Sequence, residues 1–99
     1  MSSVLALATN DSFQLSQVGT VGLLKDPWEI LYAPNGKLWI TERSTGEVSE
    51  VHPVNGAKKI LLRIDDVHPF SGQAGLVGMD YHPNLGKGMD QDWIYLTYT

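Results

Sequence analysis

Residues 28–64 read WEILYAPNGKLWITERSTGEVSEVHPVNGAKKILLRI, and this stretch decides the fold class of the chain. Short runs rich in β-branched and aromatic residues alternate with clusters of Pro, Asn and Gly, a pattern typical of strands joined by tight turns. In Pro34–Lys37 the proline fixes φ, and the following Asn-Gly accepts the positive φ of a hairpin. Ser44–Glu47 and Pro53–Gly56 have the composition of two further turns. We therefore predict one antiparallel meander of four strands.

Part of this pattern returns further along the chain. The run YAPNGK, which contains Pro34, is echoed by YHPNLGK, which contains Pro83, 49 residues later. Aligning Trp39 with Trp93 gives a spacing of 54 residues, and so an insertion of five residues in the second copy. A repeat of about 50 residues built from four-stranded units is typical of a β-propeller. The predicted fold class is all-β, a partial β-propeller of about one and a half blades of antiparallel four-stranded sheet.

The repeat also sets the expected boundaries. Residues 13–99 form the predicted partial propeller, in which 28–64 are one complete blade and 75–99 are the first half of the next. Residues 1–12 are expected to be a tail or the remnant of a signal peptide. Ala6-Leu7-Ala8 has the form of a cleavage site, but its apolar run is short and no positive residue precedes it, so we expect no intact signal peptide.

A propeller blade buries both faces against its neighbours, and about three repeats are the usual minimum for stability. One sheet and a half would leave apolar side chains short of partners and the last strand with an open edge. We expect the partners to be the remaining propeller blades of a longer polypeptide or further copies of the chain itself. The residues expected to lack partners are Trp28, Trp39, Trp93, Ile40 and Ile94, the tryptophans being the predicted inter-sheet anchors.

Composition excludes several classes of function. Seven basic and eleven acidic residues give a net charge of −4 without any basic run, so no nucleic-acid partner is expected. The absence of cysteine removes disulfides, thiolate metal sites and cysteine nucleophiles. No apolar stretch approaches the ~18 residues of a membrane span.

The sequence resembles a known family at specific motifs. Residues 27–43, PWEILYAPNGKLWITER, with TGEV after them, resemble the first blade of the soluble PQQ-dependent glucose and aldose sugar dehydrogenases, the glucose/sorbosone dehydrogenase family. GQAGLVG at 72–78 and the closing WIYLTY at 93–98 resemble later parts of the same pattern, in the same order and spacing. The resemblance covers residues 13–99.

This resemblance implies a six-bladed propeller that binds pyrroloquinoline quinone (PQQ) with calcium and oxidises the C1 hydroxyl of aldose sugars. In the family a histidine base takes the hydroxyl proton while hydride passes to the quinone, and calcium polarises the accepting carbonyl. The glutamine of the GQxGL motif faces cofactor and sugar, and that position here is Gln73. The resemblance also implies a periplasmic or secreted protein.

The remaining functional positions of the family do not occur in this sequence. The family's base lies in an Asp-His motif followed by Gly-Arg, and its cofactor-clamping residues and calcium ligands come from later blades. We therefore assign no catalytic residue and no metal ligand, and we take Gln73 as the one cofactor-binding candidate. The chain is expected to be a catalytically incomplete N-terminal portion that binds neither PQQ nor calcium alone. The alternative is a non-enzymatic propeller-type interaction or self-assembling module.

Several residues have both a functional and a structural interpretation. The Gln73 amide could bind sugar or quinone oxygens or only nearby backbone, and the resemblance favours the first. Glu42 and Arg43 could pair at the channel or in solvent at a strand end, and the sequence does not separate the two. A structural role is preferred for the spaced glycines, for the histidines that each precede a proline, and for the acidic pairs in turns. These are Gly72, Gly75 and Gly78; His52, His68 and His82; and Asp65, Asp66, Asp90 and Asp92.

Overall fold

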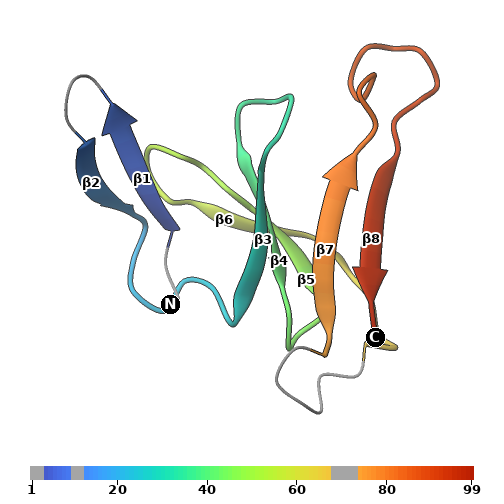
Figure 1. Ribbon diagram of the computed structural model, residues 1–99, viewed down its shortest axis with the longest axis horizontal. Coiled ribbons are helices and arrows are strands. Elements are labelled where there is room, and N and C mark those ends of the chain that lie inside the picture. Colours follow the sequence, from blue (N-terminus) through green and yellow to red (C-terminus); the bar gives the residue numbers. More distant parts are fainter. Residues whose placement is uncertain (1–3, 10–12, 68–73) are drawn as a thin grey trace.

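The computed structural model describes residues 4–9, 13–67 and 74–99. None of these residues is helical, so the described ranges contain no helix that could cross a membrane. Figure 1 shows an N-terminal hairpin, a central sheet and a C-terminal hairpin in succession. The strands are β1 (Val4–Thr9), β2 (Phe13–Val18), β3 (Pro27–Tyr32), β4 (Leu38–Glu42), β5 (Glu47–Val51), β6 (Lys58–Arg63), β7 (Leu76–Tyr81) and β8 (Ile94–Tyr98).

The central sheet is a four-stranded antiparallel meander in the order β3-β4-β5-β6, as the sequence predicted. Its first turn forms around the expected Asn-Gly pair. Gly36 has a φ of 80° and donates its N–H to the carbonyl of Ala33 at 2.9 Å. A residue with a Cβ adopts this left-handed conformation at a cost, whereas glycine does not. The turn sets the register that pairs Tyr32 with Leu38.

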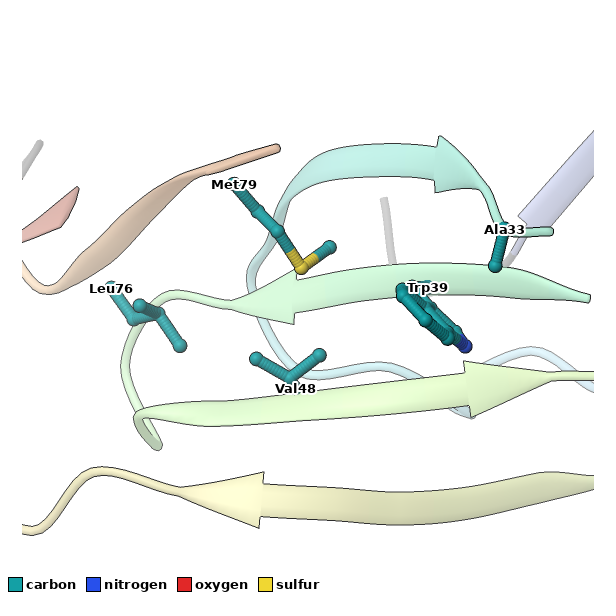
Figure 2. Close-up of a cluster of buried hydrophobic side chains, with 5 residues drawn as sticks. All are labelled: Ala33, Trp39, Val48, Leu76 and Met79. Atoms are coloured by element: carbon teal, nitrogen blue, oxygen red, sulfur yellow. The ribbon is translucent and has the colours of Figure 1, made fainter. Parts of the chain in front are cut away.

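The β7–β8 hairpin packs against one face of this sheet. Leu76 and Met79 of β7 enter a buried cluster with Trp39 and Val48 of the central sheet (Figure 2). The Trp39 and Tyr81 rings meet edge to face with their centroids 6.2 Å apart. Burial of hydrocarbon and of one large indole ring therefore holds the two sheets face to face, which is the stacking expected of successive propeller blades.

The observed register corrects the alignment of the two repeats. Tyr32 pairs with Leu38, and the repeat-related Tyr81 pairs with Ile94. The first turn has five residues, 33–37, and the second has twelve, 82–93, so the insertion is seven residues rather than the predicted five. Trp93 is therefore the last residue of its loop and does not correspond to Trp39. The identical side chains had suggested an alignment that the hydrogen bonds of the strands do not support.

The burial of the tryptophans follows from this register. Trp39 and Ile40 are buried, so the expectation that they lack partners is wrong. Ile94 is partly buried against the same cluster as Trp39. Trp28 and Trp93 are 48% and 59% exposed, so Trp39 alone of the three tryptophans acts as an anchor between the described sheets.

The N-terminal segment is a strand rather than a tail over part of its length. Strand β1 pairs with β2 along its whole length, from Val4 opposite Val18 to Thr9 opposite Phe13. After β2 the chain covers the second face of the central sheet, where Val18 and Leu24 form a small buried cluster with Ile40 and Val51. This second face is thus covered over β4 and β5 by the segment that follows the hairpin.

Candidate functional site

The sequence-predicted cofactor residue, Gln73, lies outside the described residues, as do Gly72 and His68. The described chain resumes at Ala74, just before β7. The β4–β5 turn and the start of β3 lie at the same end of the sheets as this point (Figure 1). We call this end of the sheets the β4–β5 end, and the candidate site is described from the residues that meet there.

Arg43 connects the segments that meet at the β4–β5 end. Its guanidinium donates from Nη1 to the carbonyl of Ala74 at 2.9 Å, and Nη2 lies 3.8 Å from Asp26 Oδ2. Its backbone N–H donates to the carbonyl of Asp26 at 2.9 Å, and its carbonyl accepts from the N–H of Leu76 at 3.1 Å. The side chain is 17% exposed. Arg43 therefore fixes the residue that follows Gln73 to the edge of the central sheet.

A structural role was preferred for the glycines of the GQAGLVG motif. The structure describes two of them, Gly75 and Gly78. Gly75 has a φ of 119°, and a Cβ there would lie 2.3 Å from the carbonyl oxygen of Arg43. A Cβ at Gly78 would lie 2.3 Å from Thr97 Oγ1. Gly75 is needed because the Arg43 backbone approaches too closely for a Cβ, whereas a Cβ at Gly78 would force the Thr97 side chain to shift.

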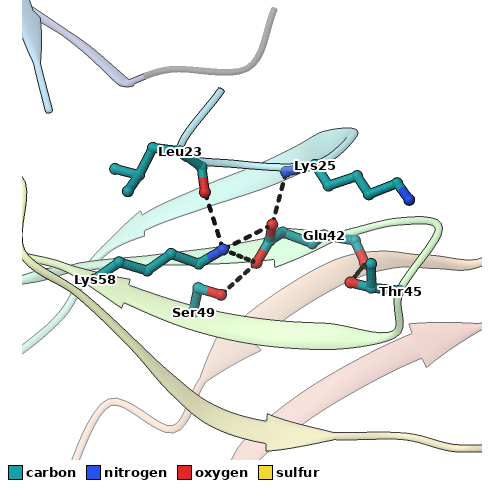
Figure 3. A network of polar contacts seen from close by, with 6 residues as sticks. All are labelled: Leu23, Lys25, Glu42, Thr45, Ser49 and Lys58. Carbon is teal, nitrogen blue, oxygen red and sulfur yellow. Dashed lines mark hydrogen bonds and ion pairs between the residues drawn. The ribbon is translucent and has the colours of Figure 1, made fainter. Parts of the chain in front are cut away.

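Glu42 and Arg43 do not pair with each other, so both interpretations of this pair were wrong. Glu42 is the last residue of β4, and Arg43 begins the turn that follows it. Glu42 is 1% exposed on the face away from β7–β8, where Lys58 Nζ lies 3.1 Å from its Oε2 (Figure 3). The backbone N–H of Lys25 donates to Oε1 at 2.7 Å, and the Ser49 hydroxyl donates to Oε2. The Glu42 carboxylate and the Lys58 ammonium are paired, and the bond from Lys25 N–H to Glu42 holds the segment before β3 against the sheet.

The two described histidines cap turns, as preferred from the sequence. His52 Nδ1 accepts from the N–H of Val54 at 3.1 Å, and His82 Nδ1 accepts from that of Asn84 at 3.1 Å. Asp92 likewise accepts from the N–H of Gly86 at 2.8 Å. Within the described ranges no three His, Asp or Glu side chains come together as ligands for an ion. The described residues do not by themselves fit a calcium site, and no reaction step is derived through one.

A hollow of about 360 Å³ lies at the opposite end of the sheets, and the sequence did not predict it. It lies between the β3–β4 turn and the β7–β8 loop. Beside it, Glu50 Oε2 accepts from Trp39 Nε1 at 3.0 Å and from Asn35 Nδ2 at 2.9 Å, and these bonds lower the pKa of Glu50. The hollow is lined by Pro34, Asn35, Trp39, Leu85, Gly86 and Asp92.

The chain was compared with family models, with the sequences of known proteins and with solved structures. Residues 24–99 match the family model described as Glucose / Sorbosone dehydrogenase. The chain is 30% identical over 98 residues to quinoprotein glucose dehydrogenase B of Acinetobacter calcoaceticus, a match that covers 98% of this chain and 20% of that protein. The structure resembles the PQQ-bound form of the aldose sugar dehydrogenase from Streptomyces coelicolor with a TM-score of 0.67 and 28% identity, over 77% of this chain and 22% of that one. The chain thus spans about a fifth of the length of these relatives.

Proposed function

Because the chain belongs to the glucose/sorbosone dehydrogenase family, we propose that it forms the N-terminal portion of a PQQ-dependent dehydrogenase that oxidises the C1 hydroxyl of aldose sugars. The observation that carries the proposal is the family match over residues 24–99, in a chain whose two successive sheets stack as blades of a partial propeller. The names of the two relatives agree with it, since one is a quinoprotein glucose dehydrogenase and the other an aldose sugar dehydrogenase with PQQ bound. A periplasmic or secreted location belongs to the same proposal.

In this proposal Gln73 faces the cofactor and the sugar. The support is its place in the GQAGLVG motif, together with the rigid anchor that follows it: Ala74 is held by Arg43 at 2.9 Å, and Gly75 bonds Thr99. An amide offers both donors and an acceptor, which suits sugar hydroxyls and quinone oxygens.

The rest of the reaction centre comes, in this proposal, from sequence beyond residue 99. The general base, the cofactor-clamping cations and the calcium ligands are contributed by later blades, and residues 1–99 supply one wall of the pocket. When bound, PQQ supplies the redox chemistry by accepting a hydride. Residues 1–99 alone therefore neither bind PQQ with calcium nor oxidise glucose.

A chimera tests the proposal. Residues 1–99 replace the matching fifth of the Acinetobacter calcoaceticus glucose dehydrogenase, and PQQ-dependent glucose oxidation is followed by reduction of a dye. We expect an active chimera whose turnover falls about tenfold or more when Gln73→Ala removes one hydrogen bond to the reacting groups. Gln91→Ala, in the β7–β8 loop at the other end of the sheets, is the matched control and should leave turnover unchanged. A chimera that melts cooperatively but does not reduce the dye would contradict the proposal, and unchanged turnover of Gln73→Ala would remove this residue from the site.

A further inference from the structure

Two turns of the central sheet carry the same pair of residues. Asn35-Gly36 lies in the β3–β4 turn and Asn55-Gly56 in the β5–β6 turn, and both asparagines are exposed. In each turn the side-chain Oδ1 of the asparagine accepts a hydrogen bond from the backbone N–H two residues further on. The donor is Lys37 at 3.1 Å in the first turn and Ala57 at 2.9 Å in the second. The two asparagines therefore share the same local hydrogen-bond pattern.

This bond folds the carboxamide back over the following peptide, as in an Asx turn. The side-chain carbonyl carbon, Cγ, is thereby brought towards the backbone nitrogen of the glycine, which has no side chain to obstruct an approach. The N–H that donates to Oδ1 also stabilises the negative charge that develops on this oxygen when Cγ is attacked. In both turns the glycine N–H donates to a carbonyl at 2.9 Å, so this bond delays an attack equally at the two sites.

The turns differ in what holds the amide nitrogen of the asparagine. Asn35 Nδ2 donates to Glu50 Oε2 at 2.9 Å, and the same oxygen accepts from Trp39 Nε1 at 3.0 Å. Within the described residues, the Asn55 side chain makes only its bond with Ala57. Attack at Asn35 must break a charge-assisted bond that attack at Asn55 does not, and it builds negative charge beside the Glu50 carboxylate.

We propose that Asn55 is a site of spontaneous covalent modification and that Glu50 protects Asn35 from the same reaction. The backbone nitrogen of Gly56 loses its proton to a base in the solvent and bonds to Asn55 Cγ. The bond from Cγ to Nδ2 breaks, and the nitrogen leaves as ammonia after taking up a proton from water, so that a succinimide ring remains. Water then opens the ring at either carbonyl. The products are aspartate and isoaspartate, in which the main chain continues through Cγ, and no group is oxidised or reduced.

The β5–β6 turn is packed so closely that isoaspartate changes its contacts. Gly56 has a φ of 73°, and a Cβ there would lie 2.3 Å from Gly19 Cα. Gly19 directly follows β2, next to Val18 of the small cluster on the second face of the sheet. Isoaspartate adds a methylene to the main chain before Gly56, at a contact too close for an added carbon. We expect this methylene to push the turn off Gly19 and to weaken the cover of the second face, whereas aspartate leaves the length of the main chain unchanged.

Peptide mapping of the aged protein tests the proposal, because trypsin places Asn35 in the peptide 26–37 and Asn55 in the peptide 44–58. The folded chain is held in mildly alkaline buffer. Each peptide is then followed by mass spectrometry and by labelling with an isoaspartyl methyltransferase. We expect Asn55 to convert about tenfold faster than Asn35, the factor that corresponds to one charge-assisted hydrogen bond. In concentrated urea, where neither turn is formed, the two sites should convert at similar rates.

Two variants test whether the difference comes from Glu50. Glu50→Ala removes the acceptor of the Asn35 amide, so the Asn35 rate should rise about tenfold, to that of Asn55, while the Asn55 rate stays the same. Glu47→Ala, on the same strand, is the matched control and should leave both rates unchanged. Circular dichroism checks that both variants fold. The proposal is overturned if the two sites convert equally fast in the folded chain, if Asn55 stays intact there, or if Asn35 remains slow in folded Glu50→Ala.

The packing consequence has its own measurement. The isoaspartyl form is separated by chromatography and unfolded in urea beside Asn55→Asp, which has the same charge and an ordinary main chain. We expect the isoaspartyl form to unfold at a lower urea concentration than Asn55→Asp. Equal midpoints would contradict the displacement of the turn from Gly19.

Discussion

One face of the central sheet is covered by β7–β8 mainly through hydrocarbon, whereas the other combines a small apolar cluster with an ion pair at one edge. On the first face Trp39, Val48 and Leu76 pack in a cluster whose members need only shape and volume to match. On the second, the carboxylate of Glu42 and the ammonium of Lys58 meet at 3.1 Å. Removing a packed apolar side chain lowers the stability of the fold in proportion to the hydrocarbon removed. Removing one partner of a buried ion pair instead leaves the other charge without compensation.

The two faces also differ in which of their residues are covered. On the apolar face, Leu76 and Met79 of β7 pack against Trp39 and Val48 of the central sheet. The second face is covered over β4 and β5 by Val18 and Leu24, and Ile30 and Tyr32 of β3 are exposed to solvent beside this cover. Substitutions on the two faces should therefore differ in size and in whether a second substitution can rescue them.

The largest effect is expected on the apolar face. Leu76 is fully buried between the sheets, so Leu76→Ala removes its hydrocarbon and leaves a cavity. We expect the free energy of unfolding to fall by about 3 kcal/mol, measured by urea denaturation at low protein concentration. Leu15→Ala, at a position 64% exposed, is the control and should change the free energy by less than about 0.5 kcal/mol. Equal losses for the two variants would mean that β7–β8 does not stack as described.

An intermediate effect is expected from the ion pair. Glu42→Gln leaves the Lys58 ammonium without its counter-charge, and we expect a loss of about 2 kcal/mol, since Lys58 is 22% exposed and regains some hydration. Adding Lys58→Met removes the unpaired charge and should restore more than half of that loss. The same urea titration measures all three proteins. If the double variant is less stable than Glu42→Gln, the pair is not the determinant of this edge.

The meander could be predicted from sequence because its determinants are local. The Asn-Gly turn at Gly36, with its φ of 80°, and the strand pattern on either side specify a hairpin without reference to anything distant. The burial of Trp39 and the pairing of Glu42 could not be predicted in this way. The first depends on a sheet that begins at Leu76, and the second on Lys58, which lies sixteen residues further along the chain on β6.

The candidate site was accessible to sequence only through the family motif. Gln73 was assigned by resemblance and stays a prediction, because it lies outside the described residues. The role of Arg43 was missed, because its contact with Ala74 spans 31 residues and no local pattern marks it. The length of the second turn was misjudged because the match of Trp93 to Trp39 compared side chains, whereas strand register is set by backbone hydrogen bonds.

The smallest effect is expected at Glu50, whose carboxylate accepts a hydrogen bond from Trp39 of the apolar face. Hydrogen bonds from Trp39 Nε1 and Asn35 Nδ2 stabilise its ionised form and lower its pKa from the ordinary value of 4.5. A carboxyl group with a lowered folded-state pKa contributes stability that is fully present above pH 4.5 and is lost as the pH falls through that lowered value. The contribution should be under about 1 kcal/mol, because water screens a partly hydrated carboxylate. Glu50→Gln should therefore flatten the acid side of the stability curve below pH 4.5 and leave its slope near neutrality unchanged. An acid slope that persists in Glu50→Gln would show that the indole and amide bonds to this carboxylate do not form in solution.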